Sequence, residues 1–211
     1  MGGNKSEQVE LTNPVDLSVG GMSGHIFRRF FHLAMFIIPV LYFEYGEDVA
    51  EKVGMTLDEV VATFVLVAVI GELIRLKLGF TVFGQREYES KQVSALAWGA
   101  LAIGLVLLIT PTKEYAYPLI FTLTFGDPFM GELRRKGIDS RNVILAACVF
   151  VLGIWLVCWY VFGTPIIVCL IVAPIAVLAE TPRLRYIDDN ATMLLIPLAA
   201  VVTLEPFFNI L

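Results

Sequence analysis

Seven apolar blocks, joined by short polar connections, account for most of the chain after its first 24 residues. A transmembrane helix needs roughly 20 mostly apolar residues, whereas a helix of a soluble protein carries its apolar residues as a single stripe. The seven blocks are Arg29–Phe43, Val60–Leu78, Val93–Ile109, Tyr115–Met130, Val143–Val161, Thr164–Leu178 and Ala191–Phe208. This pattern predicts an all-α fold, a polytopic transmembrane helical bundle with about seven spans.

The composition excludes an ordinary soluble domain. Only 17% of the 211 residues are charged and 57% are hydrophobic, whereas soluble domains carry about 25% charged residues. Two blocks, Arg29–Phe43 and Tyr115–Met130, are shorter than a span, so we expect them to be tilted, broken or partly re-entrant. Residues 1–24 contain helix-breaking Pro and Gly residues and predict a flexible tail before one domain over residues 25–211.

The distribution of Lys and Arg predicts the orientation of the bundle. With seven spans, 13 of the 15 basic residues fall on the side of the N-terminus, and only Lys52 and Lys113 fall on the other side. Short loops rich in Lys and Arg stay on the cytoplasmic side of a membrane. We therefore expect the N-terminus inside and the C-terminus outside, in a plasma membrane or the endoplasmic reticulum.

Charged residues within or next to a span are costly, by roughly 2.5–3.5 kcal/mol each at the centre of the membrane, and are therefore candidates for function. Glu72 and Arg75 are three residues apart on one helical face, where they either neutralise each other or take part in a site. Glu205 lies near the outer end of the last block, apart from the other candidates, and is interpreted as an interfacial residue.

Gly126-Asp127-Pro128, followed by Gly131, interrupts the fourth block. Pro fixes the backbone after the acid, and the glycines permit close approach of a ligand or of another segment. A carboxylate in this position is suited to a divalent cation, which prefers oxygen ligands. The alternative is a helix end with an exposed Asp.

Asp188-Asp189-Asn190 places three oxygen-bearing side chains directly before the last apolar block, and Glu180 follows the sixth. One of them is sufficient as a helix N-cap. Five basic residues occupy connections on the same predicted side: Arg134, Arg135, Lys136, Arg183 and Arg185. Acids that bind Mg²⁺ beside bases that bind phosphate are typical of phosphoryl transfer. The alternative for the basic residues is the positive-inside bias with binding of anionic lipids.

Four segments together resemble the family of dolichol kinase, phytol kinase and CTP-dependent diacylglycerol kinase. They are Arg28-Arg29-Phe30-Phe31-His32, then Glu72 through Arg75 followed by Arg86, Glu87 and Glu89, then Phe125-Gly126-Asp127-Pro128, and finally Glu180 with Asp188-Asp189-Asn190. The resemblance implies phosphoryl transfer, usually from CTP and with Mg²⁺, to the hydroxyl of a membrane lipid alcohol. In one respect the chain departs from the family, because GELRRKGIDSRN stands where the family has a Lys-Ser/Thr-x-Glu-Gly string.

We accordingly predict a lipid-alcohol kinase with a cytoplasmic site. Asp127, Asp188 and Asp189 are expected to hold Mg²⁺ and orient the hydroxyl, with Glu180 as a further metal ligand and His32 in the catalytic group. The expected nucleotide-binding residues are Arg134, Arg135, Lys136, Arg183, Arg185, Gly126, Gly131 and Asn190. The alternatives are a CTP-dependent cytidylyltransferase acting on a lipid phosphate and a non-enzymatic protein that binds or transports lipids. No nucleic-acid partner is expected, and a homo-oligomer is left open.

Overall fold

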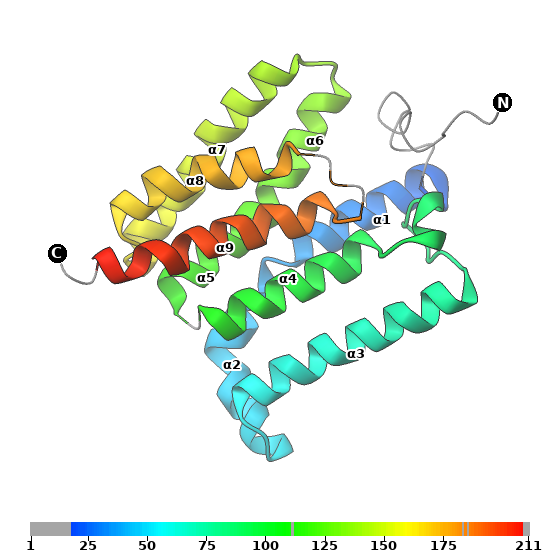
Figure 1. Cartoon of the computed structure of the whole chain (residues 1–211), viewed down its shortest axis with the longest axis horizontal. Coiled ribbons are helices and arrows are strands. Elements are labelled where there is room, and N and C mark those ends of the chain that lie inside the picture. Colours follow the sequence, from blue (N-terminus) through cyan, green and yellow to red (C-terminus); the bar gives the residue numbers. More distant parts are fainter. Residues whose placement is uncertain (1–17, 111, 183, 185, 209–211) are drawn as a thin grey trace.

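The structure is a computed structural model and describes residues 18–110, 112–182, 184 and 186–208 (Figure 1). Its helices are α1 (Gly21–Ala34), α2 (Ile37–Val53), α3 (Leu57–Leu78), the 3-10 helix η1 (Glu87–Lys91), α4 (Ala95–Ile109), α5 (Lys113–Phe121), the π-helix η2 (Thr122–Gly126), α6 (Asp127–Arg135), α7 (Ser140–Phe162), α8 (Ile166–Glu180) and α9 (Asp189–Phe208). The described residues contain no β-strand. The predicted all-helical bundle is confirmed.

The predicted tail overlaps the first helix. α1 begins at Gly21, within the segment 1–24 that the sequence analysis assigned to the tail, whereas residues 1–17 lie outside the described residues. Gly24 is buried in α1, and a Cβ there would lie 2.0 Å from the carbonyl oxygen of Val19. The glycine therefore serves close packing of the helix start against the preceding chain.

The two short blocks are the ones in which the helix is interrupted. α1 and α2 meet at an angle of 45°, because Pro39 has no N–H to donate to the carbonyl group of Met35 and its ring crowds that group. The fourth block is divided into α5, η2 and α6. Pro118 within α5 likewise leaves the Glu114 carbonyl without its helical donor, and the hydroxyl group of Thr164 donates to it at 2.6 Å.

The connections alternate between the two ends of the bundle (Figure 1). Those between α3 and α4, α6 and α7, and α8 and α9 lie at the end where α1 begins. Those between α2 and α3, α4 and α5, and α7 and α8 lie at the opposite end, as does the end of α9. The described residues that were predicted to form the site therefore share one end of the molecule.

The core surrounds α5 and η2, whose residues Leu119, Ile120 and Leu123 are fully buried together with Trp155 of α7. Large apolar side chains also cover the outside, with Val149 of α7 74% exposed and Phe64 of α3 71% exposed. Exposed apolar surface of this kind marks contact with a membrane or a partner. Two helices, α7 and α9, are long and apolar enough to cross a membrane, and the bent pair of α1 and α2 makes a third if it is one span. These features are consistent with an integral membrane protein.

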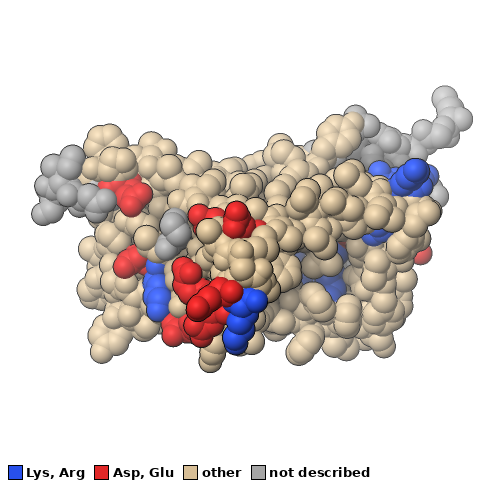
Figure 2. Space-filling model, turned by 90° about the horizontal axis from the view of Figure 1, so that it is seen from below, with Lys and Arg blue, Asp and Glu red and all other residues tan. Residues whose placement is uncertain are grey.

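Charge is unevenly distributed along the bundle. Figure 2 shows one long face, on which most visible Asp and Glu side chains lie in the left half together with some Lys or Arg side chains, while further Lys and Arg side chains lie toward the opposite end. The acidic half contains the end of α2 and the start of α3, which carry Asp48, Glu51, Asp58 and Glu59. Among the described residues, most Lys and Arg thus lie toward the end where α1 begins, with Lys52 and Lys113 as exceptions.

Candidate active site

Three carboxylates from three separate helix ends converge at the basic end of the bundle. Asp127 begins α6, Glu180 ends α8 and Asp189 begins α9, and one oxygen of each lies within 4.8 Å of the others. Glu180 is buried, Asp127 is half-buried and Asp189 is exposed. The group therefore has access from solvent on one side and protein on the other.

The π-helix η2 leads directly into Asp127. Pro128 has no N–H to donate to the carbonyl group of Thr124, which removes one bond of a regular α-helix at this point. Single π-turns inside α-helices often occur at functional sites. Thr124 lies within this turn, and its buried hydroxyl group has no hydrogen-bond partner among the described residues. The local sequence thus interrupts the helix where the acid is presented.

Arg134 binds Glu180 in a bidentate pair. Its two terminal nitrogens donate to the two carboxylate oxygens at 2.6 Å each. The Glu180 side chain is 1% exposed, whereas that of Arg134 is 43% exposed. A buried carboxylate needs such a partner to stay ionised. Arg134 stands two helical turns after Asp127 on α6, so one short helix supplies both an acid and a base to the site.

His32 reaches the same place from α1. Its Nε2 lies 3.0 Å from the carbonyl oxygen of Leu123 and 3.6 Å from a carboxylate oxygen of Asp127. Because a carbonyl oxygen only accepts, Nε2 carries the proton of that hydrogen bond. His32 is buried, and its ring is therefore held in a fixed position beside the acid.

Residues at the start of α9 both cap the helix and belong to the candidate site. The Asn190 N–H donates to carboxylate oxygens of Asp188 and Asp189, at 3.1 Å and 3.0 Å. The Asn190 side-chain amide donates to the carbonyl oxygen of Ala95 at 3.3 Å and so ties α9 to α4. Burial and the neighbouring charge of Asp189 raise the pKa of Asp188. Asp189 rather than Asp188 belongs to the three-carboxylate group, and Asp188 lies next to it.

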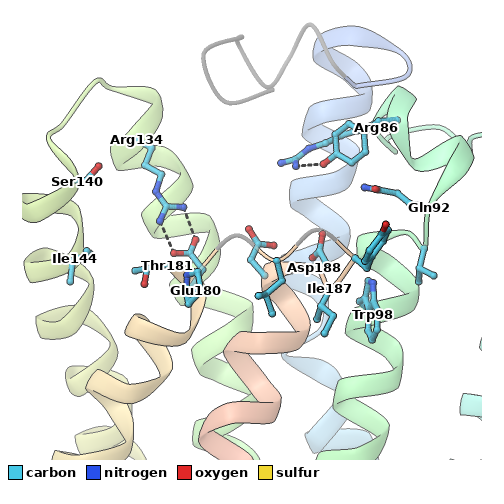
Figure 3. A pocket seen from close by; sticks show the side chains of 16 residues that line it. Arg86, Gln92, Trp98, Arg134, Ser140, Ile144, Glu180, Thr181, Ile187 and Asp188 are labelled. Atoms are coloured by element: carbon cyan, nitrogen blue, oxygen red, sulfur yellow. Dashed lines mark hydrogen bonds and ion pairs between the residues drawn. The ribbon is translucent and has the colours of Figure 1, made fainter. Parts of the chain in front are cut away.

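A cavity of about 330 Å³ opens beside the carboxylates (Figure 3). Its size falls within the range of small-molecule sites, about 300–1,000 Å³. Arg134 and Glu180 form one wall, and Arg86 and Gln92 lie on the opposite wall. Asp188 lies between the two walls (Figure 3). The cavity therefore has acidic groups at its centre and a guanidinium group on each side.

Arg86 is a residue that the sequence analysis did not place in the site. It donates to the hydroxyl group of Tyr88 at 2.6 Å. Burial opposes the charge of its guanidinium, but Tyr88 and the carboxylates of Asp189 and Asp188 raise its pKa. The sequence did indicate Arg86 in one way, because it lies in a basic connection on the predicted cytoplasmic side. Only the fold brings it opposite Arg134.

The pair Glu72 and Arg75 holds the segment that carries Arg86. Arg75 donates to both oxygens of Glu72, at 2.9 Å and 2.7 Å, and also to the carbonyl oxygens of Phe80 and Gln92. Glu72 in turn accepts from the backbone N–H and the hydroxyl group of Ser94. Mutual neutralisation is therefore only part of the role of this pair, which also fixes both ends of the α3–α4 connection.

The remaining predicted nucleotide residues lie in other surroundings. Arg135 pairs with Glu132 on the surface, and Lys136 is exposed at the end of α6. A Cβ on Gly126 would lie 2.8 Å from the side chain of Met193 and 3.2 Å from that of Val151, so this glycine permits helix packing.

Gly131 lies beside the guanidinium of Arg29, where a Cβ would lie 2.6 Å from a terminal nitrogen. This glycine brings α6 close to a basic side chain of α1. Two further residues predicted to bind the nucleotide, Arg183 and Arg185, lie outside the described residues.

The chain was compared with known proteins. No protein-family model, curated protein or solved structure matches it. The resemblance to the lipid-alcohol kinases stays a prediction from sequence.

Proposed function

We propose that the protein is a lipid-alcohol kinase, which transfers the γ-phosphoryl group of a nucleoside triphosphate to the hydroxyl of a membrane lipid alcohol. The main support is one arrangement: Asp127, Glu180 and Asp189 converge beside a cavity that has Arg134 and Arg86 on opposite walls. Phosphoryl transfer relies on positioning and on neutralisation of phosphate charge. The carboxylates and guanidinium groups of this site can serve both purposes.

The donor set suits Mg²⁺. Three carboxylate oxygens within 4.8 Å of one another are hard ligands, and Mg²⁺ normally binds through one or two carboxylates, water and substrate phosphates. Each Glu180 oxygen has a second lone pair besides the one facing Arg134. When bound there, Mg²⁺ would neutralise charge on the β- and γ-phosphates. Asp188 is proposed to support this group from the adjacent position.

The chain's own residues position the reacting groups. In the proposed reaction, the acceptor's hydroxyl oxygen forms a bond to the γ-phosphorus while the bond between the γ-phosphorus and the β–γ bridging oxygen breaks. The hydroxyl proton passes to the Asp127 carboxylate, and His32 lies beside this carboxylate with its Nε2 at 3.6 Å. The products are a lipid monophosphate and a nucleoside diphosphate. Arg134 and Arg86 would orient the donor phosphates from two sides.

CTP is the proposed donor because of the resemblance of the sequence to the CTP-dependent family. Four basic residues stay in the proposal as a source of positive potential that attracts the nucleotide: Arg135, Lys136, Arg183 and Arg185. Gly126, Gly131 and Asn190 are assigned supporting roles in helix packing around the site.

The proposed membrane arrangement has seven spans with the site on the cytoplasmic side. The short helices are accommodated because α1 with α2, and α5 with η2 and α6, each form one interrupted span. The alternation of connections in Figure 1 supports this arrangement, as does the gathering of basic residues at one end. A transporter would be expected to place polar groups near the middle of the membrane, whereas these groups lie at one end.

The test uses the purified full chain in detergent with Mg²⁺ and CTP labelled at the γ-phosphate. The acceptors are dolichol, geranylgeraniol, phytol and diacylglycerol, with EDTA as the control. Label in a lipid that is lost with EDTA supports the kinase. If no lipid is labelled with CTP, ATP or GTP, the kinase proposal is wrong. A parallel assay with lipid phosphates and CTP labelled at the α-phosphate then tests the cytidylyltransferase, which yields a CDP-lipid and pyrophosphate.

A further inference from the structure

A second cavity, of about 200 Å³, lies between α1 and the chain that enters α4. Its walls are largely apolar, with Phe27 and Phe31 from α1, Met35 directly after it, Val82 and Phe83 from the α3–α4 connection, and Leu96 from α4. Several of these side chains are also open to the outside, including Val82 at 47% and Leu96 at 49% exposed. We refer to this cavity as the apolar groove.

The fold builds one wall of the apolar groove from the connection after α3. Gly84 has a φ of +86°, and a Cβ there would lie 3.0 Å from the carbonyl oxygen of Gly24. Its N–H donates to the carbonyl oxygen of Val19 at 3.0 Å. Phe27 and Phe83 meet edge to face with their ring centroids 5.5 Å apart. The close approach requires glycine at this position and fixes the aromatic side chains of the wall.

The inner end of the groove is polar. His32 and Asn190 line it, and both are buried. Glu89 also lines this end but is already bound by Arg28 at 2.8 Å and by the backbone N–H groups of Arg86 and Ala95. Both polar residues connect the groove to the acids, because the Nε2 of His32 lies 3.6 Å from Asp127 and the N–H of Asn190 donates to Asp188 and Asp189.

The apolar groove and the polar cavity lie back to back. Arg86 and Tyr88 face the polar cavity whereas Glu89 faces the groove, and Asp189 faces the cavity whereas Asn190 faces the groove. The two spaces therefore share walls made by the same two segments. A ligand bound in either space would place its polar end near the acids at the boundary between the groove and the cavity.

We propose that the apolar groove binds the chain of the acceptor next to its hydroxyl group, and that this acceptor is a single-chain lipid alcohol. The proposal rests on the proposed kinase function for the identity of the hydroxyl, but binding in the groove is separate from phosphoryl transfer. Apolar walls with a polar inner end fit a molecule with one apolar chain and a small polar head. The exposed aromatic mouth allows the remainder of the chain to continue into the membrane.

The size of the groove favours one chain over two. Its volume of about 200 Å³ is below the roughly 300–1,000 Å³ of sites that enclose a drug-sized ligand. A diacylglycerol must place a glycerol group and the starts of two acyl chains beside its hydroxyl. A polyprenol or phytol-like alcohol needs room for only one chain, with its hydroxyl at His32.

The test is photolabelling of the purified full chain in lipid nanodiscs. The probe is a fifteen-carbon prenyl alcohol with a diazirine near the hydroxyl, and labelled peptides are identified by mass spectrometry. Two variants narrow the groove at exposed positions, Leu96→Trp and Val82→Trp. Leu145→Trp makes the same kind of change on the exposed apolar surface of α7, outside the residues that line the groove. Thermal unfolding shows whether each variant is folded.

We expect label that unlabelled geranylgeraniol displaces on peptides covering residues 27–35 and 82–96. Leu96→Trp and Val82→Trp should each lower this displaceable label at least about fivefold, since overfilling a site weakens binding, and Leu145→Trp should leave it unchanged. Equal labelling of all folded variants would overturn the groove assignment. Displacement by dioleoylglycerol as effective as that by geranylgeraniol would overturn the single-chain assignment. If displaceable label persists but no nucleotide gives a lipid phosphate, the groove still binds a lipid alcohol and the kinase proposal is wrong.

Discussion

Arg134 and Glu180 are joined by two parallel hydrogen bonds of 2.6 Å across the junction of α6 and α8. The same carboxylate belongs to the group that is proposed to hold Mg²⁺, and the same guanidinium lines the cavity proposed for the donor. With the proposed ligands bound, the pair would couple the stability of the fold to the occupancy of the site. A cation beside Glu180 would weaken the hold of the carboxylate on Arg134, which would then be more available to phosphate.

Arg134→Ala should destabilise the protein because it leaves the buried Glu180 carboxylate without its partner. We expect a loss of about 1–3 kcal/mol, reduced from the value for a fully buried pair because the Arg134 side chain is 43% exposed. Thermal unfolding in detergent without divalent cations measures this loss of stability. Arg135→Ala is the matched control, since Arg135 pairs with the surface residue Glu132 and should change stability by under about 0.5 kcal/mol.

The same variant should respond more strongly to Mg²⁺ than the unaltered protein. Once Arg134 is removed, the cation has no competitor for the Glu180 carboxylate, so Mg²⁺ should raise the melting temperature of Arg134→Ala by more degrees. Equal Mg²⁺ shifts in the two proteins would contradict competition between Arg134 and the cation for Glu180.

Asp127→Asn should abolish turnover while leaving the protein folded. The amide keeps the shape of the side chain but loses the charge that the proposed cation and the hydroxyl proton require. We expect labelled lipid phosphate to fall at least about 100-fold and the Mg²⁺-induced rise in melting temperature to shrink. Asp58→Asn, an exposed position in the first turn of α3 at the opposite end of the bundle, is the control. Full activity of Asp127→Asn would remove the central residue of the proposal.

Glu72→Gln should loosen the α3–α4 connection. Glu72 accepts hydrogen bonds from Arg75 and from the backbone and side chain of Ser94, and an amide replaces one of its two acceptor oxygens with a donor. Hydrogen–deuterium exchange should become faster across residues 80–94. Glu87→Gln changes an exposed residue of the same connection and should leave the exchange unchanged. If the two variants behave alike, Glu72 does not organise this segment.

The sequence was sufficient to predict the helices and which two blocks are interrupted, but not the form of each interruption. Every apolar block overlaps a helix of the structure, because hydropathy and length determine where a chain of this composition becomes helical. The bend between α1 and α2 follows from Pro39, whose missing N–H falls opposite Met35, yet only the packing of the bundle shows how far the helix turns there. Similarly, Pro128 marks the break at η2, but the π-turn itself depends on the tertiary contacts of this segment.

The acids of the site were predictable as a set, whereas their partners were not. Asp127, Glu180 and the pair Asp188 and Asp189 stood out because charge is costly next to an apolar helix. Which of the two adjacent aspartates turns toward Asp127 depends on where α9 begins, and the structure selects Asp189. Arg86 lies opposite Arg134 only through the fold of the α3–α4 connection.

The proposed arrangement of seven spans predicts the side of the membrane on which individual residues lie. Three exposed positions, Lys52, Lys136 and Thr181, are changed singly to Cys after the native cysteines are replaced by Ala. Three spans separate Lys52 from Lys136, and two separate Lys136 from Thr181. A maleimide that cannot cross the membrane should therefore label Lys52→Cys in intact cells, and the other two only after permeabilisation. Because an odd number of spans changes the side and an even number restores it, labelling of Lys136→Cys and Thr181→Cys from opposite sides would contradict the pairing of α7 with α8 as two spans. Labelling of Lys52→Cys and Lys136→Cys from the same side would contradict the three spans proposed between them.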